Sequence, residues 1–228
     1  MLKSRITKIK NRLLNSTAIP DIKTQPVSML FGFDRGLPID RYYIEKFLRD
    51  NTKYIQGDCL EIGGRDYTIK FGKNVKKSYI LHMDEQQDEL SIKGNLETGE
   101  GIVDNFVDCF IFTQTLPFIF DLKSTVRNVV RVLKPGGVAC ITVSGITPIS
   151  RYDMDRWGHY WSFTDLSIKK LFLQEVPESN IKIKTFGNAK ASAAFLYGHC
   201  AEEIKQSDLD YYDENYQLVI TALVIKPS

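Results

Sequence analysis

An acid stands directly before two glycines in the segment from Gly57 to Asp66. Its sequence is Gly-Asp-Cys-Leu-Glu-Ile-Gly-Gly-Arg-Asp, so an apolar run that ends in Glu61 and Ile62 meets Gly63 and Gly64. Glycines at such a point let the backbone turn tightly and come close to a bound ligand. A complete G-x-G-x-x-G pattern is absent, and a dinucleotide pyrophosphate cradle is therefore poorly supported. The segment predicts one wall of a cofactor site.

Three further polar positions follow apolar runs. Asp84 ends the run that begins at Tyr79, where a carboxylate can accept hydrogen bonds from both hydroxyls of a ribose. Asn95 and Leu96 follow the next run, where a polar and an apolar side chain could hold the edge and the face of an adenine. Gln114 stands at the end of a fourth run. Taken alone, Asp84 and Asn95 are equally well explained as turn residues.

A parallel sheet is needed to bring these positions together, and the apolar pattern predicts one. Short apolar runs alternate with amphipathic segments, which is typical of βα units. Strands are expected near 59–62, 79–83, 90–93, 107–113 and 138–143. A crossover helix is expected over 122–133, stopped by the Lys-Pro-Gly-Gly sequence at 134–137. Ligands of such sheets bind at the carboxyl ends of the strands.

The flanking segments fit the same domain. Pro38 and Asp40 predict the start of a helix over 41–49. The C-terminal part predicts, in order, a helix over 165–172 capped by Thr164, a strand over 181–186, a small-residue helix over 191–204 and a β-branched strand over 216–226. This last strand suits the interior of the same sheet better than a separate domain.

The composition narrows the class of protein. The chain has 228 residues, of which 43% are hydrophobic and 25% charged, as in one globular domain. Its net charge of +2 comes without a basic stripe interleaved with aromatics, which disfavours a nucleic-acid partner. The sequence shows no apolar stretch long enough for a transmembrane segment. No C-x-x-C pair occurs among the cysteines, which are predicted to be buried, reduced thiols of a cytoplasmic protein: Cys59, Cys109, Cys140 and Cys200.

The first 14 residues form a basic amphipathic pattern. No acid occurs among them, and the apolar residues recur at helical spacing (Leu2, Ile6, Ile9 and Leu13) between five cations (Lys3, Arg5, Lys8, Lys10 and Arg12). Such a helix could contact a membrane surface or a partner. Packing on its own domain, or fraying as a terminus, is the commoner outcome.

The order of these pieces resembles the class I S-adenosylmethionine-dependent methyltransferases. The resemblance covers about residues 57–144: a strand with Glu-x-Gly, an acid after the second strand, a polar residue after the third, the run from Asp108 to Leu116, and Leu-Lys-Pro-Gly-Gly at 133–137. Within that family the chain looks like the branch often found beside glycosyltransferases in surface-polysaccharide pathways. The segments 31–36, 40–43 and 149–158 carry this second resemblance.

The resemblance implies a fold and a cofactor. The fold would be α/β, with a doubly wound, mostly parallel, seven-stranded Rossmann-like sheet and an antiparallel strand near the C-terminus. One domain would span 1–228, with a helical part (1–50), a cofactor-binding core (51–146) and an acceptor-side loop with C-terminal strands (147–228). The cofactor would be S-adenosyl-L-methionine, bound by Glu61, Gly63, Gly64, Asp84, Asn95, Leu96 and Gln114. Asn95 replaces the family's usual acid, but the carbonyl of an amide can still accept from the adenine amine.

The methyl acceptor is expected to bind in the stretch that follows the fifth strand, which is rich in aromatics and charges. Transfer to a hydroxyl needs an in-line acceptor and a base, and His159 has the side chain for that base. Asp153 or Arg151 would orient the acceptor, and Trp157 or Trp161, with Tyr152 nearby, would form a platform for a sugar ring. The alternative, in which the tryptophans pack this stretch against the sheet and His159 is an exposed loop residue, remains open.

Two other functions remain to be distinguished. One is a catalytically inactive, cofactor-binding scaffold in a glycan-assembly complex, suggested by the shortened glycine turn. The other is nicotinamide-dependent oxidoreduction, disfavoured because the Y-x-x-x-K pair Tyr42 and Lys46 precedes the first nucleotide strand. No metal site is predicted, since His82 and His199 lack neighbouring ligands at metal-binding spacing.

Overall fold

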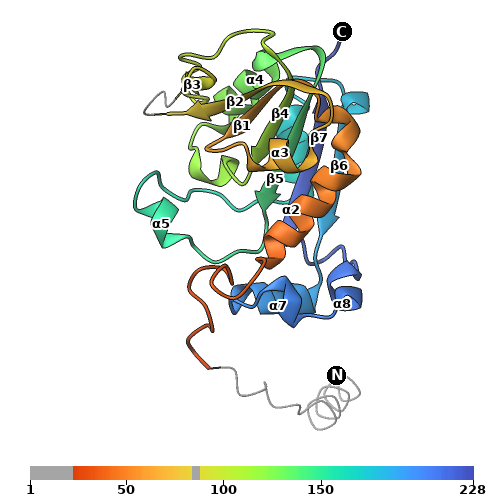
Figure 1. The fold of residues 1–228 in the computed structure, drawn as a ribbon. Helices are drawn as coiled ribbons and strands as arrows, with labels where there is room; N and C mark the ends of the chain where they lie inside the picture. The colour runs from red at the N-terminus through yellow and green to blue at the C-terminus, as the bar shows by residue number, and fades with distance from the viewer. Residues whose placement is uncertain (1–22, 84–87) are drawn as a thin grey trace, which may run out of the picture.

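The computed structural model describes residues 23–83 and 88–228, and its centre is one seven-stranded sheet (Figure 1). The predicted helix over 1–14 and the predicted ribose ligand Asp84 lie outside the described residues. The strands are β1 (Gly57–Ile62), β2 (Val75–His82), β3 (Ser91–Lys93), β4 (Val107–Thr113), β5 (Leu133–Ser144), β6 (Ile181–Phe186) and β7 (Val219–Ile225). Their order across the sheet is β3-β2-β1-β4-β5-β7-β6.

The sheet is parallel from β3 to β5, and β7 alone runs against its neighbours. β1 pairs in parallel with β2 and β4, and β4 pairs in parallel with β5. β7 lies antiparallel between β5 and β6. The predicted fold class is confirmed, including the place of the last strand inside the sheet. Strand order reverses beside β1 and β4, and ligands of doubly wound sheets bind beyond the carboxyl ends of the strands at such a point.

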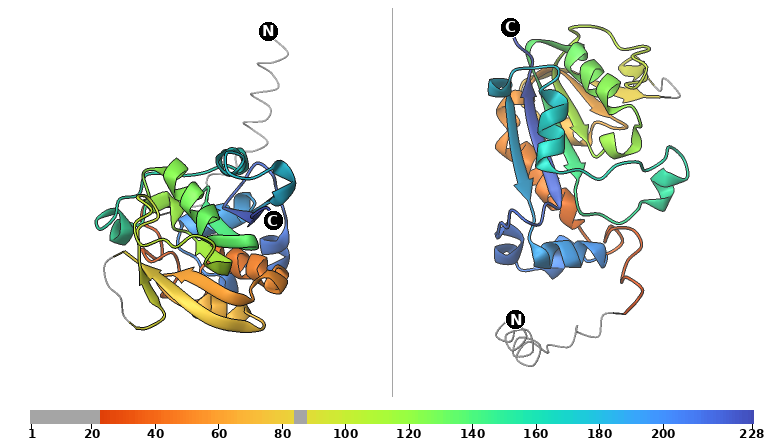
Figure 2. Two further views of the ribbon diagram at one scale, coloured as in Figure 1. Left: turned by 90° about the horizontal axis from the view of Figure 1, so that it is seen from above. Right: turned by 180° about the vertical axis from the view of Figure 1, so that it is seen from behind.

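Helices cover both faces of the sheet (Figure 2). They are α2 (Ile39–Asp50), α3 (Asp66–Phe71), α4 (Leu122–Val132), α5 (Arg151–Met154), α6 (Asp165–Phe172), α7 (Ala189–Leu196) and α8 (Gln206–Asp210). Apolar side chains of α4 and α6 pack into the core on one face, and those of α2, α3 and α7 pack into the core on the other. The apolar stripe of α4, with Val126 and Val129 fully buried, is what docks that helix.

The cysteine prediction is confirmed for burial. All four cysteines are free and buried, and Cys59, Cys109 and Cys140 lie on the three adjacent central strands β1, β4 and β5. The neighbouring thiols of Cys140 and Cys59, together with burial, raise the pKa of Cys109 well above its usual value. The Cys109 thiol is therefore a protonated, apolar part of the core.

Several element boundaries differ from the predictions. The small-residue helix over 191–204 is wrong in its second half, because α7 ends at Leu196 and Gly198 turns the chain with φ +82°. The Lys-Pro-Gly-Gly sequence at 134–137 does not form a turn between the helix and the strand. It lies within β5, because that strand already begins at Leu133. The final strand begins at Val219 and not at Tyr216. The helix over 165–172, its Thr164 cap and the strand over 181–186 are as predicted.

No helix among the described residues has both the length and the apolar character needed to cross a bilayer.

Candidate functional site

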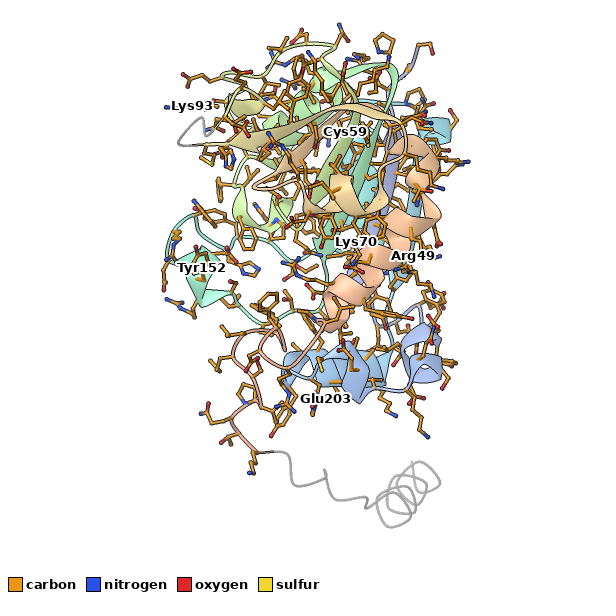
Figure 3. The ribbon with its side chains drawn as sticks, in the orientation of Figure 1. Arg49, Cys59, Lys70, Lys93, Tyr152 and Glu203 are labelled. Atoms are coloured by element: carbon orange, nitrogen blue, oxygen red, sulfur yellow. The ribbon has the colours of Figure 1, made fainter. Side chains whose placement is uncertain are left out.

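The carboxyl ends of the parallel strands lie on the side of the molecule from which α5 projects (Figure 1). The chain between β5 and α6, residues 145–164, leaves the sheet, forms the short helix α5 and returns to the body. We call it the α5 arm. Figure 3 shows Tyr152 on this arm, away from the helices that cover the sheet. The arm and the strand ends frame the region where the sequence places both binding sites.

The glycine turn after β1 is open on its outer side. Gly63 has φ +72°, and a Cβ added there would meet no atom within 4 Å. At Gly64 the nearest atom would be Asp66 Oδ2, at 3.8 Å. Most glycines of the chain are instead pressed against protein atoms, as at Gly101, where a Cβ would lie 2.1 Å from the Lys93 carbonyl oxygen. The turn therefore has the free space that a closely approaching ligand needs, and it fits the cofactor.

Glu61 holds the start of α3 against β1. Glu61 is buried, with a relative exposure of only 4%. One carboxylate oxygen accepts from the Tyr67 backbone N–H at 3.1 Å, and the other accepts from the backbone N–H and the hydroxyl of Thr68, both at 2.8 Å. Burial raises the pKa of Glu61, and the bonds from Thr68 and Tyr67 oppose that rise. Both oxygens are thus engaged in shaping the glycine turn.

The end of β2 carries a second polar group, His82. Its Nε2 is buried and has no hydrogen-bond partner among the described residues. The sequence considered His82 only as a metal ligand and missed its place at the ligand-binding edge. The signal that could have found it is its position as the last residue of the second strand. Asp84, two residues further on, remains a predicted ribose ligand.

Asn95 and Leu96 follow β3 as predicted, but the amide of Asn95 is used locally. Its Oδ1 accepts from the backbone N–H of Glu97 at 2.8 Å and of Thr98 at 3.3 Å. The structure thus forms the asparagine turn that the sequence left open. Leu96 is buried, and its carbonyl oxygen accepts from Asn128 Nδ2 at 2.8 Å. Helix α4 therefore fixes the loop that would face the adenine.

Gln114 stands at the end of β4 in a strained backbone conformation. Its φ is +48°, a region that non-glycine residues rarely adopt, and such strain is concentrated at functional sites. The backbone N–H donates to the Thr142 carbonyl oxygen at 2.8 Å, which fixes the residue to β5. Its side-chain Nε2 is buried without a partner among the described residues. A buried donor in this state is suited to a ligand that accepts a hydrogen bond.

The α5 arm is fastened to the loop after β4. The backbone N–H groups of Tyr160 and Trp161 donate to the Pro117 carbonyl oxygen at 2.8 and 3.3 Å. The indole Nε1 of Trp161 donates to the Ile119 carbonyl oxygen at 3.1 Å, and the ring packs against the main core. Trp161 thus packs the base of the arm against the sheet, as in the alternative in which the tryptophans have a packing role.

His159 belongs to the arm and packs against this loop. Its imidazole meets the ring of Phe118 edge to face, with ring centroids 5.1 Å apart and an interplanar angle of 73°. Both ring nitrogens are shielded from solvent and have no hydrogen-bond partner among the described residues. Burial lowers the pKa of His159, while the nearby charge of Asp153 acts in the opposite direction. The imidazole is therefore neutral near pH 7 and able to accept a proton.

The other predicted acceptor residues lie on and beside α5. Asp153 accepts from the Ser150 hydroxyl at the start of the helix, and Arg151 pairs with Asp155. The rings of Tyr152 and Trp157 meet edge to face with centroids 6.2 Å apart, and Trp157 is 46% exposed. Tyr152 and Trp157 thus form an exposed aromatic pair on the same arm as His159. In the described part of the chain, no hydrogen bond joins the His159 imidazole to any of these side chains.

Other features of the described surface do not compete for the site. No group of three or more His, Cys, Asp or Glu residues in 23–83 and 88–228 could hold a metal ion. An open hollow of about 480 Å³ lies between α6 and the edge strand β6, where it is lined by Asp165, Leu166, Lys169, Ile183, Lys184, Thr185 and Tyr212. None of the predicted site residues belongs to it.

The sequence of residues 73–141 matches the family model described as "Methyltransferase domain". This segment runs from the start of β2 into β5. Residues 73–141 are therefore part of a methyltransferase domain of the class I S-adenosylmethionine-dependent type. S-adenosylmethionine is accordingly its cofactor. No curated protein sequence matches the chain.

Solved structures of methyltransferases share the fold of this methyltransferase. A SAM-dependent methyltransferase from Archaeoglobus fulgidus has a TM-score of 0.50 at 13% identity, over 82% of this chain and 94% of that one. The N-methyltransferase NodS from Bradyrhizobium japonicum, solved with S-adenosylhomocysteine, has a TM-score of 0.51 at 13% identity, over 84% and 89%. An S-adenosylmethionine-dependent methyltransferase from Mesorhizobium loti has a TM-score of 0.50 at 13% identity, over 86% and 100%.

Proposed function

We propose that this methyltransferase methylates a hydroxyl group of a carbohydrate-like acceptor, with His159 as the general base. The observation that carries the proposal is the state of the His159 imidazole. Burial lowers the pKa of this imidazole, and both ring nitrogens are shielded from solvent without a hydrogen-bond partner among the described residues. A base of this kind can take a proton from a positioned hydroxyl without first losing another partner.

The cofactor occupies the carboxyl edge of β1, β2 and β4 in this proposal. The open turn at Gly63 and Gly64 receives the amino-acid end, and the buried amide of Gln114 donates to a cofactor oxygen. The loop of Asn95 and Leu96 borders the adenine, and Asp84 accepts from the ribose hydroxyls. Glu61 acts through α3 by holding the turn in shape.

The chemistry of the step is a direct displacement. S-adenosylmethionine supplies an electrophilic methyl group on a sulfonium. The acceptor oxygen attacks in line, the carbon–oxygen bond forms as the carbon–sulfur bond breaks, and the hydroxyl proton moves to His159. Phe118 fixes the plane of the imidazole, and Asp153 favours the imidazolium that results. The proton is then released to solvent.

The acceptor lies against the α5 arm in this proposal. Tyr152 and Trp157 offer exposed aromatic surface, which suits the apolar face of a sugar ring. Arg151 and Asp153 supply polar groups on the same short helix. The resemblance to methyltransferases found beside glycosyltransferases points to the same acceptor class, within surface-polysaccharide synthesis. An amine acceptor would need less help from a base than a hydroxyl does, so the role of His159 favours oxygen.

Formation of S-adenosylhomocysteine in the presence of nucleotide sugars and glycosides tests this function. Wild type should turn over at least one such acceptor, and His159→Ala should lose roughly 10²-fold or more of kcat while still binding the cofactor. His199→Ala is the matched control, because that histidine pairs with Glu203 away from the arm. Cofactor binding without transfer to any of these acceptors would favour the inactive scaffold instead.

A further inference from the structure

Helices α2 and α3 run in the same direction on one face of the sheet, and their first turns are in contact. In these first turns, Arg41 Nη1 donates to the Tyr67 hydroxyl at 3.2 Å. One turn further along both helices, Lys70 pairs with Glu45 at 2.6 Å. Because α3 begins just after the glycine turn, the start of α2 also lies at the carboxyl ends of the strands (Figure 1).

Asp40, in the first turn of α2, is a carboxylate without a paired cation. One of its oxygens accepts from the Arg41 backbone N–H at 2.8 Å, and no lysine or arginine of the described residues forms an ion pair with it. Asp40 is half-buried, and burial raises its pKa, while the N–H and the charge of Arg41 oppose that rise. A partly desolvated carboxylate is stabilised by a counter-charge in contact with it. Asp40 is therefore suited to a cationic group of a ligand.

Arg41, the next residue, is a cation without a paired carboxylate among the described residues. Its guanidinium is exposed and donates to the Tyr67 hydroxyl oxygen, whose own O–H has no acceptor in the described part of the chain. Burial raises the pKa of Tyr67, so this hydroxyl stays protonated near pH 7. Arg41 and Tyr67 thus present hydrogen-bond donors that suit a carboxylate.

The backbone of Tyr67 connects these groups to the glycine turn. Its N–H donates to a carboxylate oxygen of Glu61 at 3.1 Å, which fixes Tyr67 beside the end of β1. Gly63 and Gly64 lie between these two residues in the chain, and an added Cβ at Gly63 would meet no atom within 4 Å. An acceptor for a cation, donors for an anion and free space beside the backbone are therefore gathered around the start of α3.

We propose that Asp40, Arg41 and Tyr67 bind the amino-acid end of the cofactor. Asp40 accepts from the α-ammonium group, and Arg41 and Tyr67 donate to the α-carboxylate. The opposite charges of Asp40 and Arg41 match the two charges of an α-amino acid, which are held on one carbon. This inference rests on the placement of that end at the glycine turn, as proposed above, and does not depend on the methyl acceptor or on His159.

Calorimetric titration of the full chain tests the assignment with three ligands: S-adenosylhomocysteine, its analogue without the α-amino group and its analogue without the α-carboxylate. Wild type should bind S-adenosylhomocysteine at least about tenfold more tightly than either analogue, because each analogue lacks one charged contact. Asp40→Asn should lose about tenfold in affinity for S-adenosylhomocysteine and none for the analogue without the amino group. Arg41→Gln should lose as much, but none for the analogue without the carboxylate. Tyr67→Phe should show the same selectivity as Arg41→Gln.

Glu45→Gln is the matched control, because this acid lies one turn further along α2 and its partner is Lys70. It should bind all three ligands like wild type. Equal losses for all three ligands in Asp40→Asn would indicate a purely structural role and overturn the proposal. Unchanged affinity of Asp40→Asn and Arg41→Gln for S-adenosylhomocysteine would overturn it alone if Gly63→Ala weakens binding. If Gly63→Ala also binds like wild type, the placement of the amino-acid end at the glycine turn is wrong as well.

Discussion

The hydroxyl and backbone N–H of Thr68 both donate to one oxygen of the buried Glu61 carboxylate, each at 2.8 Å. This contact joins the carboxyl end of β1 to the first turn of α3. The glycine turn lies between the two residues, so its shape depends on their distance. The acid before the glycines therefore shapes the turn.

Replacement of Glu61 should cost stability as well as cofactor affinity. Glu61→Ala leaves the buried N–H of Thr68 and that of Tyr67 without an acceptor, and we expect a loss of about 1–3 kcal/mol in the free energy of unfolding. Urea titration measures it. Glu61→Gln, which keeps an acceptor oxygen, should lose less. An alanine variant as stable as wild type would contradict this reading of the contact.

The pH dependence of kcat should follow His159. Burial lowers the pKa of this histidine below its usual value of about 6.5, so activity should rise with pH through a midpoint below that value and be level near pH 7. Since the unfolded chain binds the proton more readily, stability should fall as the pH drops from about 6.5 toward the folded pKa. His159→Ala should remove both effects. If kcat of this variant still falls at low pH, the fall is caused by the titration of another group.

Substitution by alanine should affect mainly cofactor binding at Gly63 and mainly stability at Gly101. Gly63→Ala meets no protein atom, so it should cost only about 1 kcal/mol for its positive φ while weakening S-adenosylhomocysteine binding at least about tenfold. Gly101→Ala collides with the Lys93 carbonyl oxygen and should destabilise the fold much more. Thermal melts and calorimetric titration separate the two effects. Unchanged binding in Gly63→Ala would remove the turn from the site.

The two tryptophans of the α5 arm should separate function from packing. Trp161 packs on the core and donates to Ile119, so Trp161→Ala should lower the free energy of unfolding by about 3 kcal/mol or more. Trp157 is half exposed, so Trp157→Ala should leave stability within about 0.5 kcal/mol and raise the KM for the acceptor. A Trp157 variant with unchanged KM would exclude it from the acceptor platform.

An ion pair at the opposite end of the sheet should weaken in acid. Burial alone would raise the pKa of Asp108, but the Asp58 backbone N–H at 2.7 Å and Lys134 Nζ at 2.9 Å lower it overall. Its contribution is therefore present above about pH 3.9 and lost as the pH falls through the folded pKa. Because the pair is partly exposed, Asp108→Asn should cost only about 0.5–1 kcal/mol at pH 7. Urea denaturation of wild type and Asp108→Asn at pH 7 and at pH 3 measures this difference in the free energy of unfolding. An equal loss of stability at both pH values would contradict the stabilising role of the Asp108 ion pair.

The sheet could be predicted from the sequence because its strands are buried on both faces. Runs such as Val107–Thr113 are almost unbroken in their apolar character, and the helix between β4 and β5 shows a clear apolar stripe. The end of α7 was mispredicted because no proline stops the sequence between Leu196 and Ile204. What ends the helix is tertiary: Gly198 turns the chain where Ser28 lies against it, and a one-dimensional pattern does not contain that contact.

The sequence predicts which residues belong to the candidate site, but it does not predict which of their polar atoms are free to bind a ligand. Strand ends predict which residues share one edge of the sheet, and Gln114 does directly follow β4. Whether a polar atom is free depends on neighbours distant in the chain or on turn geometry. Thus the bonded state of Glu61, the occupied Oδ1 of Asn95 and the unpaired Nε2 of His82 emerge only in three dimensions.

Calorimetric titration of Gln114→Ala with S-adenosylhomocysteine tests the cofactor site most directly. The buried Nε2 of Gln114 has no partner among the described residues, and alanine carries the same backbone strain at φ +48°, so the variant should melt no lower than wild type. If the cofactor occupies this edge of the sheet, its dissociation constant should rise at least about tenfold. Unchanged affinity in a folded variant would contradict the placement of the cofactor beside Gln114.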